Sequence, residues 1–475
     1  MKIVNEELLA LTPLDGRYAR DTAPLREHFS EFAYLRGRAR LEIAYLIALS
    51  QEVKLIRPLS QDELDFLKNL SVNFSLEDAE GVKDIEQTTR HDVKAIENFL
   101  RKRLSQTSLA DTVSWLHFGL TSEDVNLTAQ AISLRNARDQ TLLPALDKII
   151  AQTADFARRY KSTPMLARTH GQPAVPTTFG KEMAVFLARL AKQREKLSGH
   201  TFEAKWSGAV GNYNAMVAAL PNIDWPTFSG TFLRRQGLEP AQISTQLIPY
   251  DNWLEYFQIL QLINGILLDL CQDMWRYISD DYLKLRAMTG EVGSSTMPQK
   301  VNPINFENAE GNLGLANALF EQYIRKLPAS RLQRDLSDST VRRSFGESLG
   351  HTLVAWTSLA QGMDRVEANE AGMWSALEAY WKIIAEGAQT ILRAANIPSA
   401  YEQLKSLTRG MEITQKNYQD WVEALEVDET VKSKLRSLSP FTYIGLAEDI
   451  TESNVSRRWD KTNKKSQSQE TLESE

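Results

Sequence analysis

Residues 251–287 read DNWLEYFQILQLINGILLDLCQDMWRYISDDYLKLRA, and this stretch decides which kind of fold to expect. Apolar side chains recur at spacings of three and four from Trp253 to Ile278, which is typical of a helix. Leu254, Leu262 and Ile266 fill positions between them, so the predicted helix is apolar around most of its girth. A helix of that kind belongs inside a bundle or a subunit interface.

The same periodicity dominates the chain after about residue 108, whereas alternating strand patterns are scarce. Helices are predicted near 124–160, 178–205, 251–287, 305–326, 344–367 and 373–395. We therefore expect an all-α fold, a long helical bundle with smaller helical domains before and after it. The predicted domains are 1–111, 112–364 and 365–459, followed by a polar tail, 460–475. That tail cannot bury enough apolar surface to offset the entropy of ordering, so we expect it to be disordered.

Composition indicates which partners are not expected for this protein and which cellular compartment it suits. The 475 residues carry a net charge of −6, which gives no reason to expect nucleic acid or an anionic membrane as partner. No segment approaches 18 uninterrupted apolar residues, and the first residues lack the apolar core of a signal peptide. The single cysteine, Cys271, cannot form an internal disulfide, which fits a reducing compartment. We expect a cytoplasmic protein without membrane contact.

A polar stretch follows the long helix, Gly293-Ser-Ser-Thr-Met-Pro-Gln-Lys-Val-Asn-Pro303. Its glycine and two prolines predict a loop. Three hydroxyls, the Lys300 ammonium and the Asn302 amide can gather hydrogen-bond donors around an anion. The alternative is a solvated connection between two helices, which is what most such loops are.

Further polar segments lie far apart in the sequence: 11–18, 85–94, 114–126, 167–178 and 331–343. The segment 167–178 is broken by a glycine and two prolines and is expected to be a loop before a helix. Each has an ordinary interpretation beside a functional one. Thr88 or Thr89, and Thr121 or Ser122, can cap the helices that follow them. His91 and His170 can be structural histidines, and the arginines of 331–343 can form a solvated face. Arg17 can be a surface charge or a phosphate ligand, because its planar fork suits phosphate.

Motifs for metals and common cofactors are absent: the sequence has no HExxH, CxxC, P-loop or GxGxxG after a strand. Chemistry must then come from acid–base groups and positive donors. A histidine, a hydroxyl, a lysine and an asparagine suit proton abstraction beside a carboxylate, followed by expulsion of a leaving group. Ammonium and amide donors would stabilise the carbanion, and a histidine would protonate the leaving atom.

The 293–303 loop resembles the signature of the fumarase/aspartase superfamily, Gly-Ser-Ser-x-Met-Pro-x-Lys-x-Asn-Pro, at every fixed position. The segments Leu14–Tyr18, Thr88–Val93, Thr121–Asn126 and Arg168–Ala174 resemble one branch, the bacterial type of adenylosuccinate lyase. The similarity covers roughly residues 10–450. Two positions differ from the form typical of that branch, because Gln299 and Arg90 stand where His and Asn are common.

The resemblance implies anti-β-elimination of fumarate from adenylosuccinate, giving AMP, and from SAICAR, giving AICAR. It implies a homotetramer whose sites take residues from three subunits, with no metal or organic cofactor. Ser294 would remove the Cβ proton, His170 would protonate the departing purine nitrogen, and Lys300 would hold the charged carboxylate. Glu307 matches a glutamate that orients the acid histidine. The implied substrate contacts are Arg17, Tyr18, Arg90, His91, Asp92, Thr121, Ser122, Gln246, Asn302, Asn308, Arg334, Ser339, Thr340 and Arg343.

Two other functions compete with this one. Another eliminase of the superfamily would act on argininosuccinate, malate or aspartate, but the arginines suited to phosphate argue against the smaller substrates. An inactive helical scaffold is the second alternative, and the intact Ser294, His170 and Lys300 argue against it.

Overall fold

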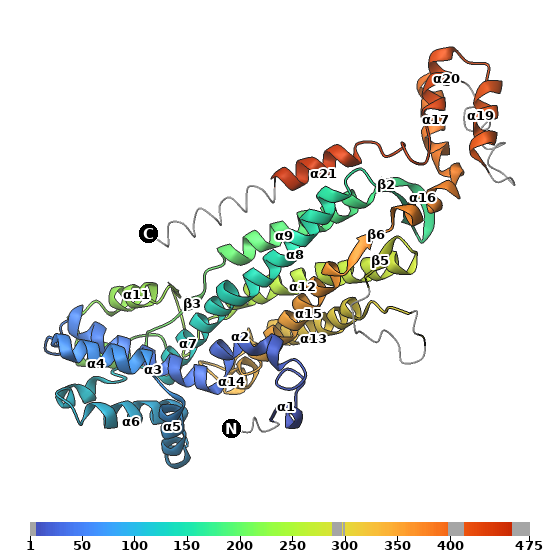
Figure 1. Ribbon diagram of the computed structural model, residues 1–475. Coiled ribbons are helices and arrows are strands. Elements are labelled where there is room, and N and C mark those ends of the chain that lie inside the picture. Colours follow the sequence, from blue (N-terminus) through green and yellow to red (C-terminus); the bar gives the residue numbers. More distant parts are fainter. Residues whose placement is uncertain (1–5, 287–296, 298–299, 398–412, 458–475) are drawn as a thin grey trace. The chain divides into compact units, whose positions relative to one another are not determined.

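The computed structural model describes residues 6–286, 297, 300–397 and 413–457. These residues are mostly helical, with short strands paired in two-stranded sheets (Figure 1). The chain splits into two compact units. The first takes Met1–Ala145, Glu195–Asn264 and Gly311–Ala355, and the second takes Leu146–Arg194, Gly265–Glu310 and Trp356–Glu475. Ser294 and the tail 460–475 lie outside the described residues.

The elements that lie wholly in the first unit are short or medium helices and one strand pair. They are α1 (Glu6–Leu9), α2 (Ala19–Phe29), α3 (Glu31–Gln51), α4 (Gln61–Val72), α5 (Leu76–Thr89), α6 (Asp92–Leu104), η1 (Ala110–Trp115), α7 (Ser122–Ala137), the π-helical turn η2 (Arg138–Leu142), β3 (Glu203–Ala204), α10 (Asn214–Ala219), α11 (Trp225–Arg235), β4 (Glu239–Pro240) and α14 (Ser337–Arg342).

The second unit holds two antiparallel strand pairs and the C-terminal helices. Its elements are β1 (Pro164–Thr169), β2 (Gln172–Thr178), β5 (Leu283–Leu285), β6 (Val366–Ala368), α16 (Glu370–Glu378), η3 (Trp381–Ile384), α17 (Ala385–Ala394), α19 (Gln415–Ala424), α20 (Glu429–Arg436) and α21 (Ala447–Val455). The long helices have residues in both units: α8 (Leu143–Arg159), α9 (Phe179–Gly199), α12 (Asp251–Ser279), α13 (Ile304–Lys326) and α15 (Phe345–Asp364).

Helices α3 to α6 enclose an apolar core that includes Leu46, Leu67 and Leu100. Ser60 and Ser75 start α4 and α5 with capping boxes, in which a serine and an acidic residue satisfy each other's backbone N–H groups. The expected cap by Thr88 or Thr89 was wrong, because both residues belong to α5. His91 caps α6 instead, and its ring accepts from the Lys94 N–H.

Helix α12 matches the strongest sequence prediction, and its residues Trp253, Phe257, Leu260 and Met274 are fully buried. It ends at Ser279 and not at 287, because Asp281 adopts a left-handed conformation (φ 58°) and the chain enters β5. By length and composition alone α12 could cross a membrane, but a mostly buried core helix passes the same test.

The other predicted helices are present with changed limits. The 124–160 pattern forms α7, η2 and α8 in sequence. The 373–395 pattern is broken at Tyr380 (φ −130°, ψ 50°) into α16, η3 and α17. Residues 167–178 were expected to form a loop, but they form most of the β1–β2 hairpin. The all-α fold class is confirmed.

Candidate active site

Thr121 and Ser122 lie where α7 begins, and a buried carboxylate fixes this turn. Asp124 accepts from the Thr121 N–H at 2.8 Å, which completes a capping box. The same carboxylate accepts from the Lys205 ammonium at 2.5 Å and from the N–H groups of Ser207 and Gly208 at 2.9 and 3.0 Å. Asp124 and Lys205 are both buried, so this contact is shielded from water. The turn is therefore held to the 205–208 segment.

The arginine segment 331–343 lies in the same unit. Arg334 donates to the Gln246 side-chain oxygen at 3.2 Å, and the Gln246 amide donates to the Ala209 carbonyl at 3.1 Å. Arg334 also contacts Glu123 at 2.8 Å. Ser339 and Thr340 lie on α14, which ends directly before Arg343. Thus Arg334 and Gln246 share one network that reaches Glu123, and Thr121 belongs to a second that is centred on Asp124, the next residue in the chain.

Asp92 lies between two arginines of this unit. Its carboxylate contacts Arg38, which is buried, at 2.9 Å and Arg343 at 3.9 Å. Burial alone would raise the pKa of Asp92, but the charge of Arg38 and the Val93 N–H outweigh it and hold the pKa below its usual value. Arg90, in a left-handed conformation, and the exposed His91 precede it. Asp92 therefore joins the 90–92 segment to Arg343.

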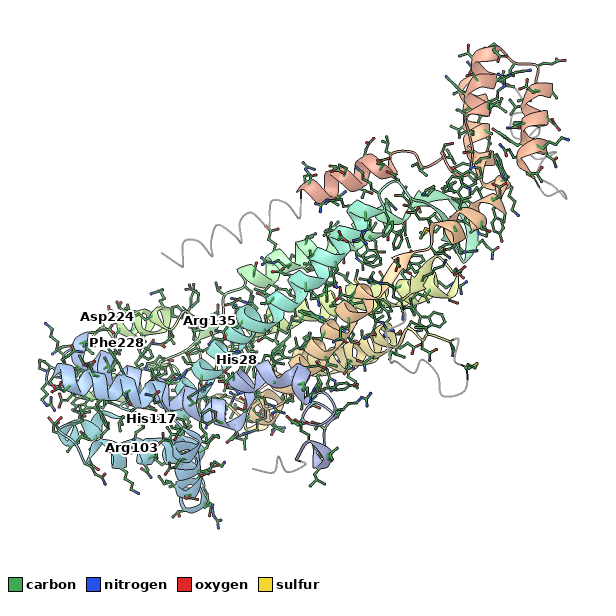
Figure 2. The ribbon with its side chains drawn as sticks, in the orientation of Figure 1. His28, Arg103, His117, Arg135, Asp224 and Phe228 are labelled. Carbon is green, nitrogen blue, oxygen red and sulfur yellow. The ribbon has the colours of Figure 1, made fainter. Side chains whose placement is uncertain are left out.

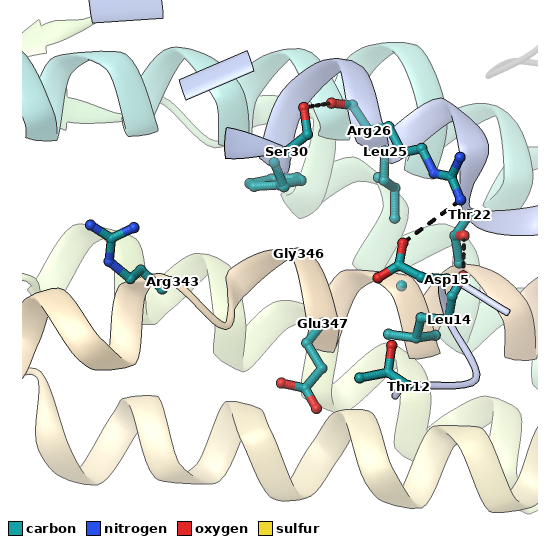
Figure 3. Close-up of a pocket in the computed structure, with 12 residues that line it drawn as sticks. Thr12, Leu14, Asp15, Thr22, Leu25, Arg26, Ser30, Arg343, Gly346 and Glu347 are labelled. Atoms are coloured by element: carbon teal, nitrogen blue, oxygen red, sulfur yellow. Dashed lines mark hydrogen bonds and ion pairs between the residues drawn. The ribbon is translucent and has the colours of Figure 1, made fainter. Parts of the chain in front are cut away.

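A pocket of about 250 Å³ separates the N-terminal turn from α15 (Figure 3). One side comes from Thr12, Asp15 and α2, and the other comes from Arg343 and Glu347. Arg26 pairs with Asp15 at 3.7 Å across the first side. Arg17 and Tyr18 follow Asp15 after one residue, Gly16, so the turn that carries them borders the pocket that Asp15 and Arg343 line.

His170 lies in the second unit, at the tip of the β1–β2 hairpin. His170 (φ 53°) and Gly171 (φ 72°) form its two-residue turn, and two positive φ values are those of a type I′ turn. Arg168 donates to the Gly171 carbonyl at 3.3 Å and lies 3.8 Å from Asp280. The His170 side chain is exposed and has no hydrogen-bond partner among the described residues. The imidazole of His170 is therefore accessible at the tip of the hairpin.

The other proposed groups of this unit lie around the start of α13. Lys300 is exposed, and its backbone N–H donates to Met297. Asn302 precedes α13, whose first turn carries Glu307, followed by Asn308. The Trp275 indole N–H donates to the Glu307 carboxylate at 3.1 Å. Among the described residues, no hydrogen bond or ion pair joins Glu307 to His170, and Ser294 lies outside them.

Several residues that support these groups were not singled out from the sequence: Glu123, Asp124, Lys205, Trp275 and Arg342. Glu123 and Asp124 were quoted only as part of the segment beside Thr121. Acidic residues in the first turn of a helix usually face water, so the sequence gives no signal that these two are buried. Among the described residues, no group of three or more His, Cys, Asp or Glu is arranged to hold a metal ion.

Comparison with known proteins identifies the family. Residues 16–317 match the family model described as Lyase, and residues 330–444 match the one described as Adenylosuccinate lyase C-terminal. The chain is 43% identical to the adenylosuccinate lyase of Haemophilus influenzae, over 94% of this chain and 98% of the relative. It is 43% identical to the one of Dictyostelium discoideum (93% and 98% covered) and 41% identical to the one of Escherichia coli (93% and 97%).

Solved structures agree on the fold. A fumarate lyase from Mesorhizobium superposes with a TM-score of 0.74 at 18% identity, covering 92% of this chain and 98% of that one. The 3-carboxy-cis,cis-muconate lactonizing enzyme of Pseudomonas putida gives 0.74 at 20%, covering 93% and 98%. These structures show the fold, whereas the family models and the sequence relatives confirm the resemblance predicted from the motifs: the chain belongs to the adenylosuccinate lyase family.

Proposed function

We propose that this protein eliminates fumarate from adenylosuccinate, giving AMP, and from SAICAR, giving AICAR. The observation that carries the proposal is identity of 41–43% over 93–94% of the chain to proteins named adenylosuccinate lyase. Both substrates carry a succinyl group on nitrogen, and in both the carbon–nitrogen bond breaks as fumarate leaves.

The proposed mechanism assigns the proton transfers to two side chains. Ser294 takes the Cβ proton, and its hydroxyl needs activation because it is a weak base. Lys300 and Asn302 hold the neighbouring carboxylate, on which charge accumulates as the proton leaves. The electron pair then forms the carbon–carbon double bond of fumarate, while His170 gives a proton to the departing nitrogen. The exposed position of His170 supports this role, because a ligand can reach its ring.

Glu307 is proposed as the carboxylate that orients His170, and the bond from Trp275 supports a fixed position for it. The phosphate of the nucleotide is proposed to lie near Arg17, Tyr18 and Arg343. The pocket between the N-terminal turn and α15 supports this placement, since it is lined by Arg343 and by Asp15, which lies two residues before Arg17. Arginine suits phosphate because its donors match the oxygens in pairs.

We also propose a cytoplasmic homotetramer whose sites take residues from three subunits. Exposed apolar side chains on long helices support an interface: Leu262 and Trp275 on α12, and Ile304 and Leu315 on α13. Each is about half exposed in the single chain, and apolar surface of this kind marks association sites.

The decisive experiment is to incubate the purified protein with adenylosuccinate and measure AMP and fumarate. We expect wild-type turnover, and we expect Ser294→Ala and His170→Ala each to lower kcat by about 10²–10⁴-fold, the usual contribution of acid–base catalysis. His28→Ala is the matched control, because His28 is a half-buried histidine without a proposed role. Near-normal kcat in either test variant would refute its role. Turnover of argininosuccinate but not of adenylosuccinate would favour the other branch of the superfamily.

A further inference from the structure

The first turn of α7 carries a second buried carboxylate, Glu123, beside Ser122. Only 1% of Glu123 is exposed. Its two oxygens contact two arginines that lie more than 200 residues away in the sequence: Arg334 at 2.8 Å and Arg342 at 2.7 Å. The Asn126 amide also donates to Glu123 at 2.8 Å. One side chain thus joins the turn of Thr121 and Ser122 to the arginine segment.

The two arginines are held differently. Arg342 is buried, and besides Glu123 it binds Asp338 at 2.8 Å and the Gln130 side chain. Asp338 in turn accepts from the Tyr250 hydroxyl at 2.9 Å. Each of the three guanidinium nitrogens of Arg342 therefore has a hydrogen-bond partner, and this fixes the position of the side chain. Its position fixes the Glu123 carboxylate.

Arg334 is less completely held. Its Nε lies 3.8 Å from Asp338 Oδ1, which is too long for a hydrogen bond, and both buried atoms lack a hydrogen-bond partner. Its firm contacts are therefore those to Glu123 and to Gln246. Glu123 neutralises Arg334 on the α7 side, and among the described residues it is the one α7 side chain that pairs with this guanidinium.

We propose that Glu123 is a positioning residue, which holds the Arg334 guanidinium in register with Thr121 and Ser122 so that both segments contact one substrate. The inference rests on the proposed function, which gives these segments their substrate. It predicts a larger effect on substrate binding than on the chemical step, because Glu123 supports binding groups and not the proton-transfer groups.

The test variant is Glu123→Gln, which keeps the size of the side chain and removes its charge. We expect KM for adenylosuccinate and the dissociation constant of AMP to rise together by about 10- to 100-fold, the range for losing a charged hydrogen bond. The fall in kcat should be much smaller. Steady-state kinetics, calorimetry with AMP and melting temperatures would be measured for each variant.

Glu63→Gln is the matched control. Glu63 is also buried, and it binds Arg57 through two hydrogen bonds of 2.8 Å, but it borders none of the proposed substrate ligands. It should lose stability with little change in KM. If Glu123→Gln does not fold, Asp338→Asn replaces it, since that change loosens Arg342 without altering α7, and KM should again rise.

Two results would overturn the inference: a KM in Glu123→Gln no higher than in Glu63→Gln, or a loss confined to kcat. For Asp338→Asn, an unchanged KM would do the same. Measuring the turnover of the wild-type protein distinguishes a wrong positioning role for Glu123 from a wrong proposed function. A wild-type protein that releases no fumarate would refute both, whereas normal wild-type kinetics with an unaltered variant KM would refute the positioning role alone.

Discussion

Asp124 shows how much of the fold depends on single buried charges. Asp124→Asn would leave the Lys205 ammonium buried beside a neutral amide. Because an uncompensated buried charge is costly, we expect the free energy of unfolding to fall by about 3–5 kcal/mol. Denaturant unfolding would measure the loss.

Asp155→Asn is the matched control for that change, since Asp155 pairs with Arg159 on the surface, with both side chains more than half exposed. An exposed pair contributes about 0–1 kcal/mol, so this variant should unfold almost like the wild type. Equal losses in the two variants would contradict the importance of burial at Asp124.

For single residues, the polar segments could be recognised in the sequence, but the buried ion pairs that hold them in place could not. Thr121, His170 and Lys300 could be selected because the motifs that contain them are continuous. The bonds from Asp124 to Lys205 and from Glu123 to Arg342 span 81 and 219 residues, and local periodicity carries no information over such distances. These residues became visible only when the fold brought them together.

The contact between α3 and the turn before α7 provides a prediction about pH. His117 Nδ1 lies 2.6 Å from the Glu42 carboxylate, and His117 is labelled in Figure 2. Burial lowers the pKa of His117. The hydrogen bond and charge of Glu42, with the charge of Glu97, raise that pKa by more than burial lowers it, so the net shift is upward. The stabilisation is therefore complete below the unfolded pKa of about 6.5 and is lost as pH rises through the folded pKa.

We expect the melting-temperature difference between wild type and His117→Gln to be larger at pH 6 than at pH 9. His28→Gln is a control of opposite sign (Figure 2), because burial and the charge of Arg36 lower the pKa of His28 despite Glu27. Its neutral form is favoured in the folded state, so wild-type stability relative to this variant should rise with pH. A difference for His117→Gln that does not change with pH would exclude the charged pair.

Helices could be predicted where one apolar spacing continues over many residues. Prediction was less accurate where the residue types in a segment favour different structures. Helix α12 was found because its apolar pattern runs for seven turns, whereas its end depends on the backbone at Asp281. The β1–β2 hairpin was missed because Pro173 and Pro176 argue against a strand. The break at Tyr380 was hidden, since Trp381 and Ile384 are buried and continue the apolar pattern.

For the whole molecule, the motifs predicted the family and the apolar periodicity predicted the fold class, and both are confirmed. The predicted domain limits remain a prediction, as do the site residues and the assembly. Periodicity identifies which helices are apolar but not which chain covers them. Leu262 and Trp275 illustrate this, because both are exposed in the single chain. Apolar side chains at these positions suit packing against a helix of the same chain and packing against a partner subunit equally well.

The assembly can be tested by mixing the two inactive variants. If each site takes Ser294 from one subunit and His170 from another, a Ser294→Ala subunit can supply the histidine and a His170→Ala subunit the serine. After unfolding and refolding an equal mixture, about one site in four should hold both intact groups, so activity should rise far above that of either variant. Differently tagged subunits would verify that hybrids form, and each variant refolded alone would give the baseline. Hybrids without activity would place Ser294 and His170 of one site in the same subunit, because then every site in the mixture would lack one of the two.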